Sequence, residues 1–84
     1  MLPIHQLVDR IRWDKAFADA DFKIGFFDRP SHDVIYVPLK EIQFDQQDPY
    51  FFHFYDEEGE EHNVPLHRIK SVYRNGELIW HREH

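Results

Sequence analysis

The dipeptide Asn75-Gly76 constrains this chain most, because it separates two short runs rich in apolar residues, "IKSVYR" and "ELIW". Asn-Gly favours a two-residue type I′ turn, since both positions of that turn need a positive φ. The sequence therefore predicts an antiparallel hairpin with apolar residues on both faces, either covered on both sides or curled into a barrel. Pairing outward from the turn sets Arg74 opposite Glu77, Tyr73 opposite Leu78, Val72 opposite Ile79 and Ser71 opposite Trp80.

The N-terminal segment has the spacing of an amphipathic helix. Its apolar residues Ile4, Leu7, Val8 and Ile11 recur at i, i+3, i+4 and i+7, which places them on one helix face. Pro3 suits the first turn, where a missing N–H costs nothing. We expect this face to pack against a sheet, together with strand residues such as Phe52, Val72 and Ile79.

The remaining apolar runs predict short strands. Residues 22–38 have the pattern of a hairpin, and "YFFHFY" is the most strand-like run in the chain. Residues 39–44 predict either a short helical turn or a bent strand, and residues 13–21 an irregular link anchored by Phe17. We find no internal repeat. The predicted fold class is α+β: one domain over residues 1–84, whose N-terminal amphipathic helix packs on a strongly bent antiparallel sheet. That sheet has five or six short strands and could be barrel-like.

Composition excludes several classes of function. The absence of cysteine excludes disulfides, thiolate metal sites and cysteine nucleophiles. A formal net charge of −6 argues against a non-specific nucleic-acid coat, which works by neutralising many phosphates. Five of the 16 acidic residues lie in "DEEGEE" (residues 56–61), which we interpret as a solvated turn. No apolar run is long enough for a membrane span and no basic leader precedes the first helix, so we expect a cytoplasmic protein without membrane contact.

Motifs that would indicate catalysis are not found. The three glycines lie too far apart for a phosphate-binding loop, and neither serine lies in a nucleophile elbow. None of the seven histidines has a recognised ligand spacing, so we expect no metal and no other cofactor. The histidine-x-serine/threonine pairs of one class of cyclic phosphodiesterases are also missing. Binding is therefore favoured over catalysis, although the sequence leaves the question of an enzyme open.

Cations next to aromatic residues are the remaining chemical signal. "RIRW" contains Arg12 and Trp13, "FFDR" contains Arg29, and "LHRI" contains His67 and Arg68. An arginine fork donates to phosphate through two parallel bonds, and aromatic rings give nucleobases a surface on which to stack.

Each of these residues also has a structural interpretation. Arg29 could pair with Asp28 or Asp33, since surface ion pairs are common. Trp13 is more often a core residue, and the imidazole of His67 could bond a backbone carbonyl. The C-terminal "WHREH" is expected to be a frayed tail.

The segments "PIHQLVDRIRWD", "FKIGFFDR", "VPLKEIQF" and "VPLHRIKSVYRNGELIW" occur in this order. With them the chain resembles, over residues 3 to 82, the RNA cyclic-group end recognition domain family, a small family long listed as uncharacterised. The resemblance implies a module that recognises RNA ends carrying a 2′,3′-cyclic phosphate, in RNA processing or repair. It assigns phosphate binding to Arg12, Arg29, His67 and Arg68. Trp13 and Asp28 match its motifs as supporting residues, and we add Tyr73 as a stacking wall.

Three functions follow from these observations, in order of preference. The first is a non-catalytic RNA-end binding module, whose partners would be RNA 3′ ends with a cyclic phosphate and RNA-processing enzymes, but not DNA. The second is a protein–protein adaptor that uses "DEEGEE" and exposed aromatic residues without any RNA contact. The third is a phosphoesterase acting on RNA ends through His67. For the first, we expect Arg12, Arg29, His67 and Arg68 to converge on one concavity, walled by Trp13 or Tyr73.

Overall fold

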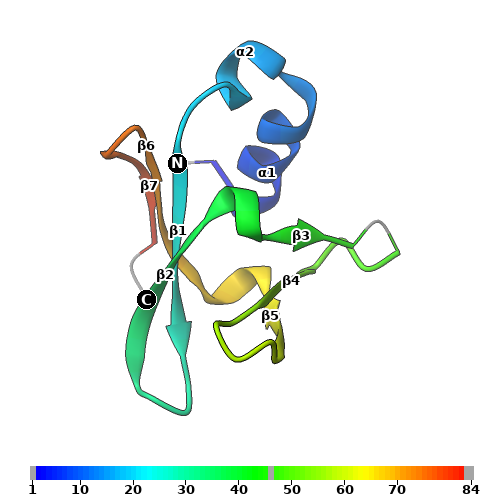
Figure 1. The fold of residues 1–84 in the computed structure, drawn as a ribbon. Coiled ribbons are helices and arrows are strands. Elements are labelled where there is room, and N and C mark those ends of the chain that lie inside the picture. Colours follow the sequence, from blue (N-terminus) through cyan, green and yellow to red (C-terminus); the bar gives the residue numbers. More distant parts are fainter. Residues whose placement is uncertain (1, 46, 83–84) are drawn as a thin grey trace.

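Seven strands make up two antiparallel sheets over residues 2–45 and 47–82, the part of the chain that this computed structural model describes (Figure 1). The elements, in chain order, are α1 (Ile4–Trp13), α2 (Lys15–Ala18), β1 (Phe22–Asp28), β2 (Asp33–Pro38), the 3-10 helix η1 (Leu39–Glu41), β3 (Gln43–Phe44), β4 (Phe51–Tyr55), β5 (Glu61–Pro65), the 3-10 helix η2 (Leu66–Arg68), β6 (Ile69–Arg74) and β7 (Glu77–His81). The predicted α+β class with an N-terminal helix is confirmed.

The strands form two sheets, whereas the sequence predicted one. One has four strands in the order β2-β1-β6-β7, and the other has three in the order β3-β4-β5. The sequence predicted a single bent sheet of five or six strands. Within the described residues, neither sheet closes into a barrel. The chain leaves one sheet and enters the other through a 3-10 helix, and this break in strand pairing produces two sheets instead of one.

The two crossovers between the sheets share a sequence pattern. Residues 37–42 are "VPLKEI" and residues 64–69 are "VPLHRI". In each, the proline has an extended backbone conformation and precedes a 3-10 helix. The first and last residues of the pattern are buried. Proline fixes φ and lacks an N–H, so it ends the strand and starts the turn. This short internal repeat was not predicted from the sequence, because six residues are too few to stand out without the structure.

The helix α1 packs as its spacing predicted. Ile4, Leu7, Val8 and Ile11 are all buried, and they join one core cluster with residues of both sheets. The prediction that Phe52, Val72 and Ile79 accompany them is confirmed, although Ile79 is only partly buried.

Phe52 connects the two sheets. It is 0% exposed, and its ring centroid lies 5.7 Å from that of Phe26 on β1 and 6.5 Å from those of Phe44 and Phe54. Edge-on aromatic pairs of this kind contribute about 0.5–1.5 kcal/mol each beyond the area they bury. Phe52 is the most buried ring of this contact between the sheets, which the Phe26–Phe54 pair at 5.7 Å also joins.

The C-terminal hairpin forms at the predicted turn with a shifted register. Asn75 and Gly76 have φ of 51° and 81°, and Arg74 faces Glu77 while Tyr73 faces Leu78, as predicted. The next two predicted pairs are wrong. A bulge between Val72 and Tyr73 sets Val72 opposite Trp80 and Ser71 opposite His81. A bulge inserts one unpaired residue and leaves the pairs on the turn side unchanged.

The link between α1 and β1 is more ordered than predicted. It contains α2, whose first turn is capped by the Asp14 side chain, which accepts from the Phe17 backbone N–H at 3.1 Å. The Phe17 ring packs against Phe22 and has the guanidinium groups of Arg10 and Arg74 at 4.0 Å and 5.0 Å from its centroid. Phe17 is thus the anchor that the sequence predicted, held between two cations.

No described helix combines the length and the apolar character that crossing a bilayer requires.

Candidate functional site

His67 and Arg68 lie in η2, a 3-10 helix that follows a proline, as Lys40 and Glu41 do in η1. Leu66 and Ile69 on either side are buried, so the two residues between them turn outward: His67 is exposed and Arg68 half-buried. The fold therefore requires two polar residues here, but η1 shows that they need not be histidine and arginine. Packing therefore does not account for histidine and arginine at these two positions, whereas binding of a ligand would.

Arg68 has a hydrogen-bonding deficit. Its Nε is buried and has no hydrogen-bond partner among the described residues. Leaving a buried donor of a charged group unpaired costs roughly 1–3 kcal/mol or more, so native structures rarely keep such groups without a reason. Because this atom has almost no accessible surface, a ligand would supply its acceptor only with a movement of the side chain.

Arg82 places a further guanidinium beside η2. Its Nη1 donates to the backbone carbonyl of His67 at 2.6 Å, its Cζ lies 5.2 Å from the Trp80 ring centroid, and its backbone N–H donates to Lys70 at 2.8 Å. The expectation of a frayed tail is therefore wrong up to Arg82, while residues 83–84 lie outside the described residues. Trp80 and Arg82 are two apart on an extended chain and share a face, a signal that could have identified Arg82 from the sequence. We call His67, Arg68 and Arg82 the basic cluster.

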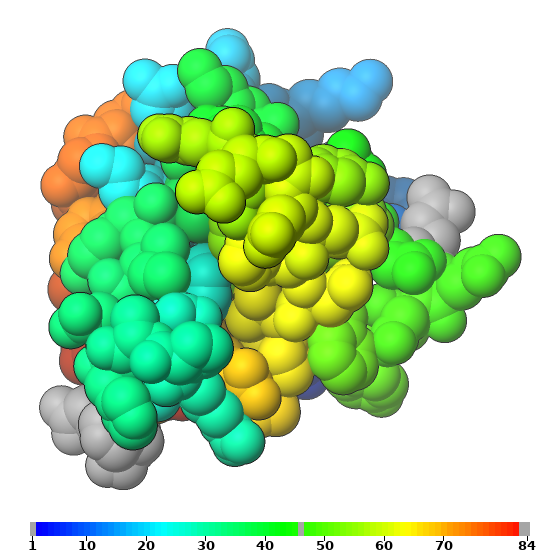
Figure 2. Space-filling model, turned by 60° about the horizontal axis from the view of Figure 1, so that its bottom comes forward, coloured from blue at the N-terminus to red at the C-terminus, as the bar shows by residue number. Residues whose placement is uncertain are grey.

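Asp28 and Arg29 lie where β1 ends, and β1 contacts η2. Figure 2 shows the amber segment around η2 against the teal end of the β1–β2 hairpin. Asp28 Oδ2 accepts from the Ser31 backbone N–H at 3.2 Å, so this carboxylate shapes the turn. Arg29 is exposed, and in the described part of the chain it forms an ion pair with neither Asp28 nor Asp33. The structure thus brings Arg29 to the same end of the sheet as η2.

Arg12 and Trp13 lie elsewhere. They end α1, which continues directly into α2 beside the start of β1, while the turn holding Arg29 is at the other end of that strand (Figure 1). Trp13 is 83% exposed, so the expectation that it is a core residue is wrong. Arg12 lines a cavity of about 200 Å³ that also includes Leu66 of η2.

The four predicted cations therefore do not share a described cavity. Tyr73 lines a second, larger cavity without any of them, and Arg29, His67 and Arg68 line neither of the two. The expectation of one concavity is corrected to a basic cluster at η2, with Arg29 near it and Arg12 apart. The phosphate-binding roles of these residues stay a prediction.

The basic cluster is electrostatically available. Within residues 2–45 and 47–82, the two ion pairs are Arg10 with Asp14 at 3.7 Å and His62 with Asp56 at 2.7 Å. No described carboxylate neutralises Arg68 or Arg82. The Arg82 guanidinium contacts the backbone of η2, which carries Arg68, and each of these guanidinium groups can donate to an anion with one or two exposed oxygens.

A comparison with known protein families shows which family matches this chain. The family model described as the MJ1316 RNA cyclic group end recognition domain matches residues 1–82.

The chain belongs to this family. The resemblance drawn from "IRW", "DR" and "P-x-HRI" is thereby confirmed, and the family's description points to recognition of RNA ends with a cyclic group. Searches of curated proteins and of solved structures each found no match.

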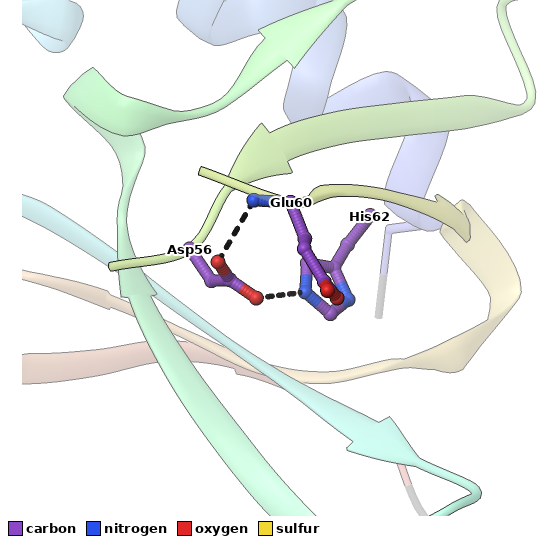
Figure 3. Close-up of side chains that lie close together, drawn as sticks. All are labelled: Asp56, Glu60 and His62. Carbon is purple, nitrogen blue, oxygen red and sulfur yellow. Dashed lines mark hydrogen bonds and ion pairs between the residues drawn. The ribbon is translucent and has the colours of Figure 1, made fainter. Parts of the chain in front are cut away.

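This MJ1316-type domain has a second polar cluster, at the β4–β5 turn, that could hold a metal ion. Ligand atoms of Asp56, Glu60 and His62 all lie within 4.8 Å of one another (Figure 3). The His62 Nε2 already bonds Asp56 Oδ2, and the Asp56 Oδ1 accepts the backbone N–H groups of Glu58 and Glu60 at 2.9 and 3.0 Å. These bonds, led by the one from His62, lower the pKa of Asp56 below its usual range.

The geometry gives this cluster a structural role. The His62 ring stacks on Phe54 with centroids 4.9 Å apart, which fixes the imidazole against the core. Asp56 gathers two backbone donors and one ring nitrogen, and so closes the turn. "DEEGEE" is a turn, as predicted, but its first carboxylate is an organised acceptor rather than a merely solvated charge.

Proposed function

We propose that this chain is a non-catalytic module that binds RNA ends carrying a 2′,3′-cyclic phosphate, in RNA processing or repair in the cytoplasm. The observation that supports it best is the basic cluster: His67, Arg68 and Arg82 lie together without a described carboxylate partner in a member of this family. Arg29, at the same end of the sheet as η2, is assigned to the phosphate next to the end. Arg12 and Trp13, at the end of α1, keep their predicted roles in phosphate binding and support at a separate contact with the RNA.

The chemistry of the ligand matches the cluster. A cyclic phosphodiester carries one negative charge, two non-bridging oxygens and no free 3′ hydroxyl. A guanidinium donates two parallel hydrogen bonds to such a group, and each charge-assisted bond contributes roughly 1.5–3 kcal/mol.

The site favours binding over hydrolysis. Opening the cyclic phosphate requires a general base and a general acid on opposite sides of the phosphorus. Among the described residues, no side chain forms a hydrogen bond with the His67 imidazole; its recorded partner, Arg82, bonds the backbone carbonyl instead. Turnover of the cyclic phosphate that is lost in His67→Ala would establish the phosphoesterase alternative.

The adaptor alternative rests on a specific observation. Trp13 is 83% exposed and Tyr50 71% exposed, and large exposed rings are typical of protein-binding surfaces. On this alternative the basic cluster would be structural and no RNA end would be distinguished.

The test is a titration with three short RNAs of identical sequence that end in cyclic phosphate, 3′-phosphate or 3′-hydroxyl. We expect the cyclic end to bind more tightly than the hydroxyl end, and the RNA to be recovered intact. Arg68→Ala should weaken binding of the cyclic end about tenfold to a hundredfold, since it removes a charge-assisted contact. Lys15→Ala removes one exposed positive charge from α2 and should leave the end preference unchanged. Equal affinity for all three ends would reject end recognition, and no binding to any of the three RNAs would favour the adaptor.

A second variant uses the internal repeat. Replacing His67 and Arg68 by Lys and Glu gives η2 the polar pair that η1 already carries, so the backbone should tolerate it. The double variant should keep its thermal unfolding temperature within a few degrees and lose the preference for the cyclic end. A folded double variant that keeps this preference would exclude η2 as the binding site.

A further inference from the structure

A larger cavity lies on the outer face of the four-stranded sheet. It has a volume of about 1130 Å³, and its lining includes Lys23, Tyr36, Lys40 and Tyr73. In an antiparallel sheet, directly paired residues share a face. Lys23 pairs with Tyr73, and Gly25 pairs with both Tyr36 and Ser71. The alternate residues Phe22, Ile24 and Phe26 are buried in the core. Lys23, Gly25 and the residues paired with them therefore lie on the opposite face, turned away from α1.

Gly25 allows the two tyrosines to meet across a strand. Tyr36 is on β2 and Tyr73 on β6, and both strands flank β1, so their backbones are roughly 10 Å apart. The ring centroids are nevertheless 6.2 Å apart, at an interplanar angle of 60°. A Cβ on residue 25 would lie 2.8 Å from Tyr36 Cε1 and 2.7 Å from Ser71 Oγ. The missing side chain therefore makes room for the Tyr36 ring over β1.

The resulting surface is exposed and carries cations. Tyr36 is 52% exposed, and Lys23 and Lys40 are exposed at the same cavity. Within the described ranges neither lysine has a carboxylate at ion-pair distance, although Asp21 also lines the cavity. Exposed rings beside unpaired lysines match single-stranded nucleic acid, whose bases stack on aromatic groups while its phosphates meet cations.

We propose that this face binds the nucleotides that precede the RNA end, with bases stacked on Tyr36 and Tyr73 and phosphates bound by Lys23 and Lys40. The inference extends the proposed function and relies on it for the position of the terminus. β1 runs from this cavity to η2, and at about 3.3 Å per residue Lys23 lies roughly 17 Å from the end of the strand at Asp28. A short single strand can span that distance.

The test measures binding of two fluorescent six-nucleotide RNAs, one ending in cyclic phosphate and one in 3′-hydroxyl. Tyr36→Leu and Tyr73→Leu should each weaken both RNAs about tenfold and by the same factor, because stacking ignores the end. Affinity for a nucleoside 2′,3′-cyclic phosphate should not change. Tyr36→Phe keeps the ring and should keep the affinity. Tyr55→Leu is the matched control, since Tyr55 is 53% exposed but lies on the other sheet.

The salt dependence of RNA binding in lysine variants is a measurement that a folding defect would not change in the same way. Each phosphate contact on a single strand contributes about 0.7 to the slope of log affinity against log salt concentration. Lys40→Ala should therefore lower that slope by about 0.7, and Lys15→Ala should leave it unchanged.

The outcomes separate this inference from the proposed function. If the tyrosine variants bind both RNAs more weakly, and the wild type shows no preference between the two ends, the tyrosine face is supported and the end-recognition proposal is rejected. If Tyr36→Leu and Tyr73→Leu bind both RNAs as tightly as the wild type does, and the preference for the cyclic end is intact, the tyrosine face alone is overturned. Self-association of the wild type that Tyr36→Leu abolishes would assign this face to a second copy of the chain and also overturn it.

Discussion

The two sheets use their polar side chains in opposite ways. All the side-chain to side-chain hydrogen bonds among the described residues lie on the three-stranded sheet and the turn of its β4–β5 hairpin. They join His53 to Gln43, Tyr55 to Glu61, His62 to Asp56 and Asn63 to Glu61. This sheet satisfies its own polar groups.

On the four-stranded sheet, and in Arg82 just after it, arginine and tryptophan side chains donate instead to backbone carbonyls of distant segments. Arg74 Nε bonds Phe17, Trp80 Nε1 bonds Leu2, and Arg82 Nη1 bonds His67. These bonds hold α2, the N-terminus and η2 in place, and they leave the positive charges without a carboxylate. The difference teaches that the three-stranded sheet pairs its polar side chains with one another, whereas the described cations of the four-stranded sheet and of Arg82 stay without a carboxylate partner, as the proposed anion site requires.

The largest expected effect breaks the junction between the sheets. Phe52→Ala should lower the free energy of unfolding by about 3–5 kcal/mol, since it empties a fully buried aromatic site. Chemical denaturation followed by circular dichroism would measure this loss. A loss below about 1 kcal/mol would mean that the sheets do not depend on this ring.

A matched pair of glycines compares the sheets directly. Gly59 in the β4–β5 turn and Gly76 in the β6–β7 turn both have φ of 81°, and neither has a neighbour within 4 Å of an added Cβ. Replacing either by alanine imposes the same backbone strain, roughly 1–2 kcal/mol. If the sheets unfold as one unit, both variants should shift a single denaturation midpoint by similar amounts. Two separate transitions, each sensitive to one variant, would show that the sheets are independent.

The smallest effect concerns Asp56 and appears as a pH dependence. Because its pKa is lowered in the folded state, Asp56 stabilises the fold above the ordinary carboxyl range and loses that contribution as the pH falls through the lowered value. Asp56→Asn keeps an acceptor oxygen but not the charge, so it should unfold at a lower temperature than the wild type at pH 7. The gap should begin to narrow as the pH falls below about 4, the ordinary carboxyl range, and should close only when the pH has passed the lowered pKa of folded Asp56. A gap that is the same at pH 7 and pH 3 would contradict this account of the turn.

Much of the fold follows from local sequence signals. The spacing of Ile4, Leu7, Val8 and Ile11 fixed the helix, and Asn75-Gly76 fixed the last turn, because each signal acts over a few residues. The division into two sheets could not be predicted. It depends on how the two "VPL" crossovers turn the chain, and on a bulge at Val72 whose cause lies in packing rather than in local sequence.

The candidate site was predicted only in part. His67 and Arg68 were found because they interrupt an apolar run, but their 3-10 geometry was not. Arg12 and Arg29 were grouped with them by residue type, although the length of β1 separates those two. Arg82 and the Tyr36–Tyr73 pair were missed as a unit, since they depend on strand neighbours and on the space above Gly25.

The most direct test of the difference between the sheets is an NMR titration of the isotope-labelled chain with uridine 2′,3′-cyclic phosphate. We predict the largest shifts at the Arg68 side-chain Nε–H and at the backbone of residues 67–69 and 82, with unchanged signals over residues 51–65. Uridine without the phosphate should produce much smaller shifts at those positions. Shifts centred on the three-stranded sheet, or equal shifts from uridine, would contradict the account.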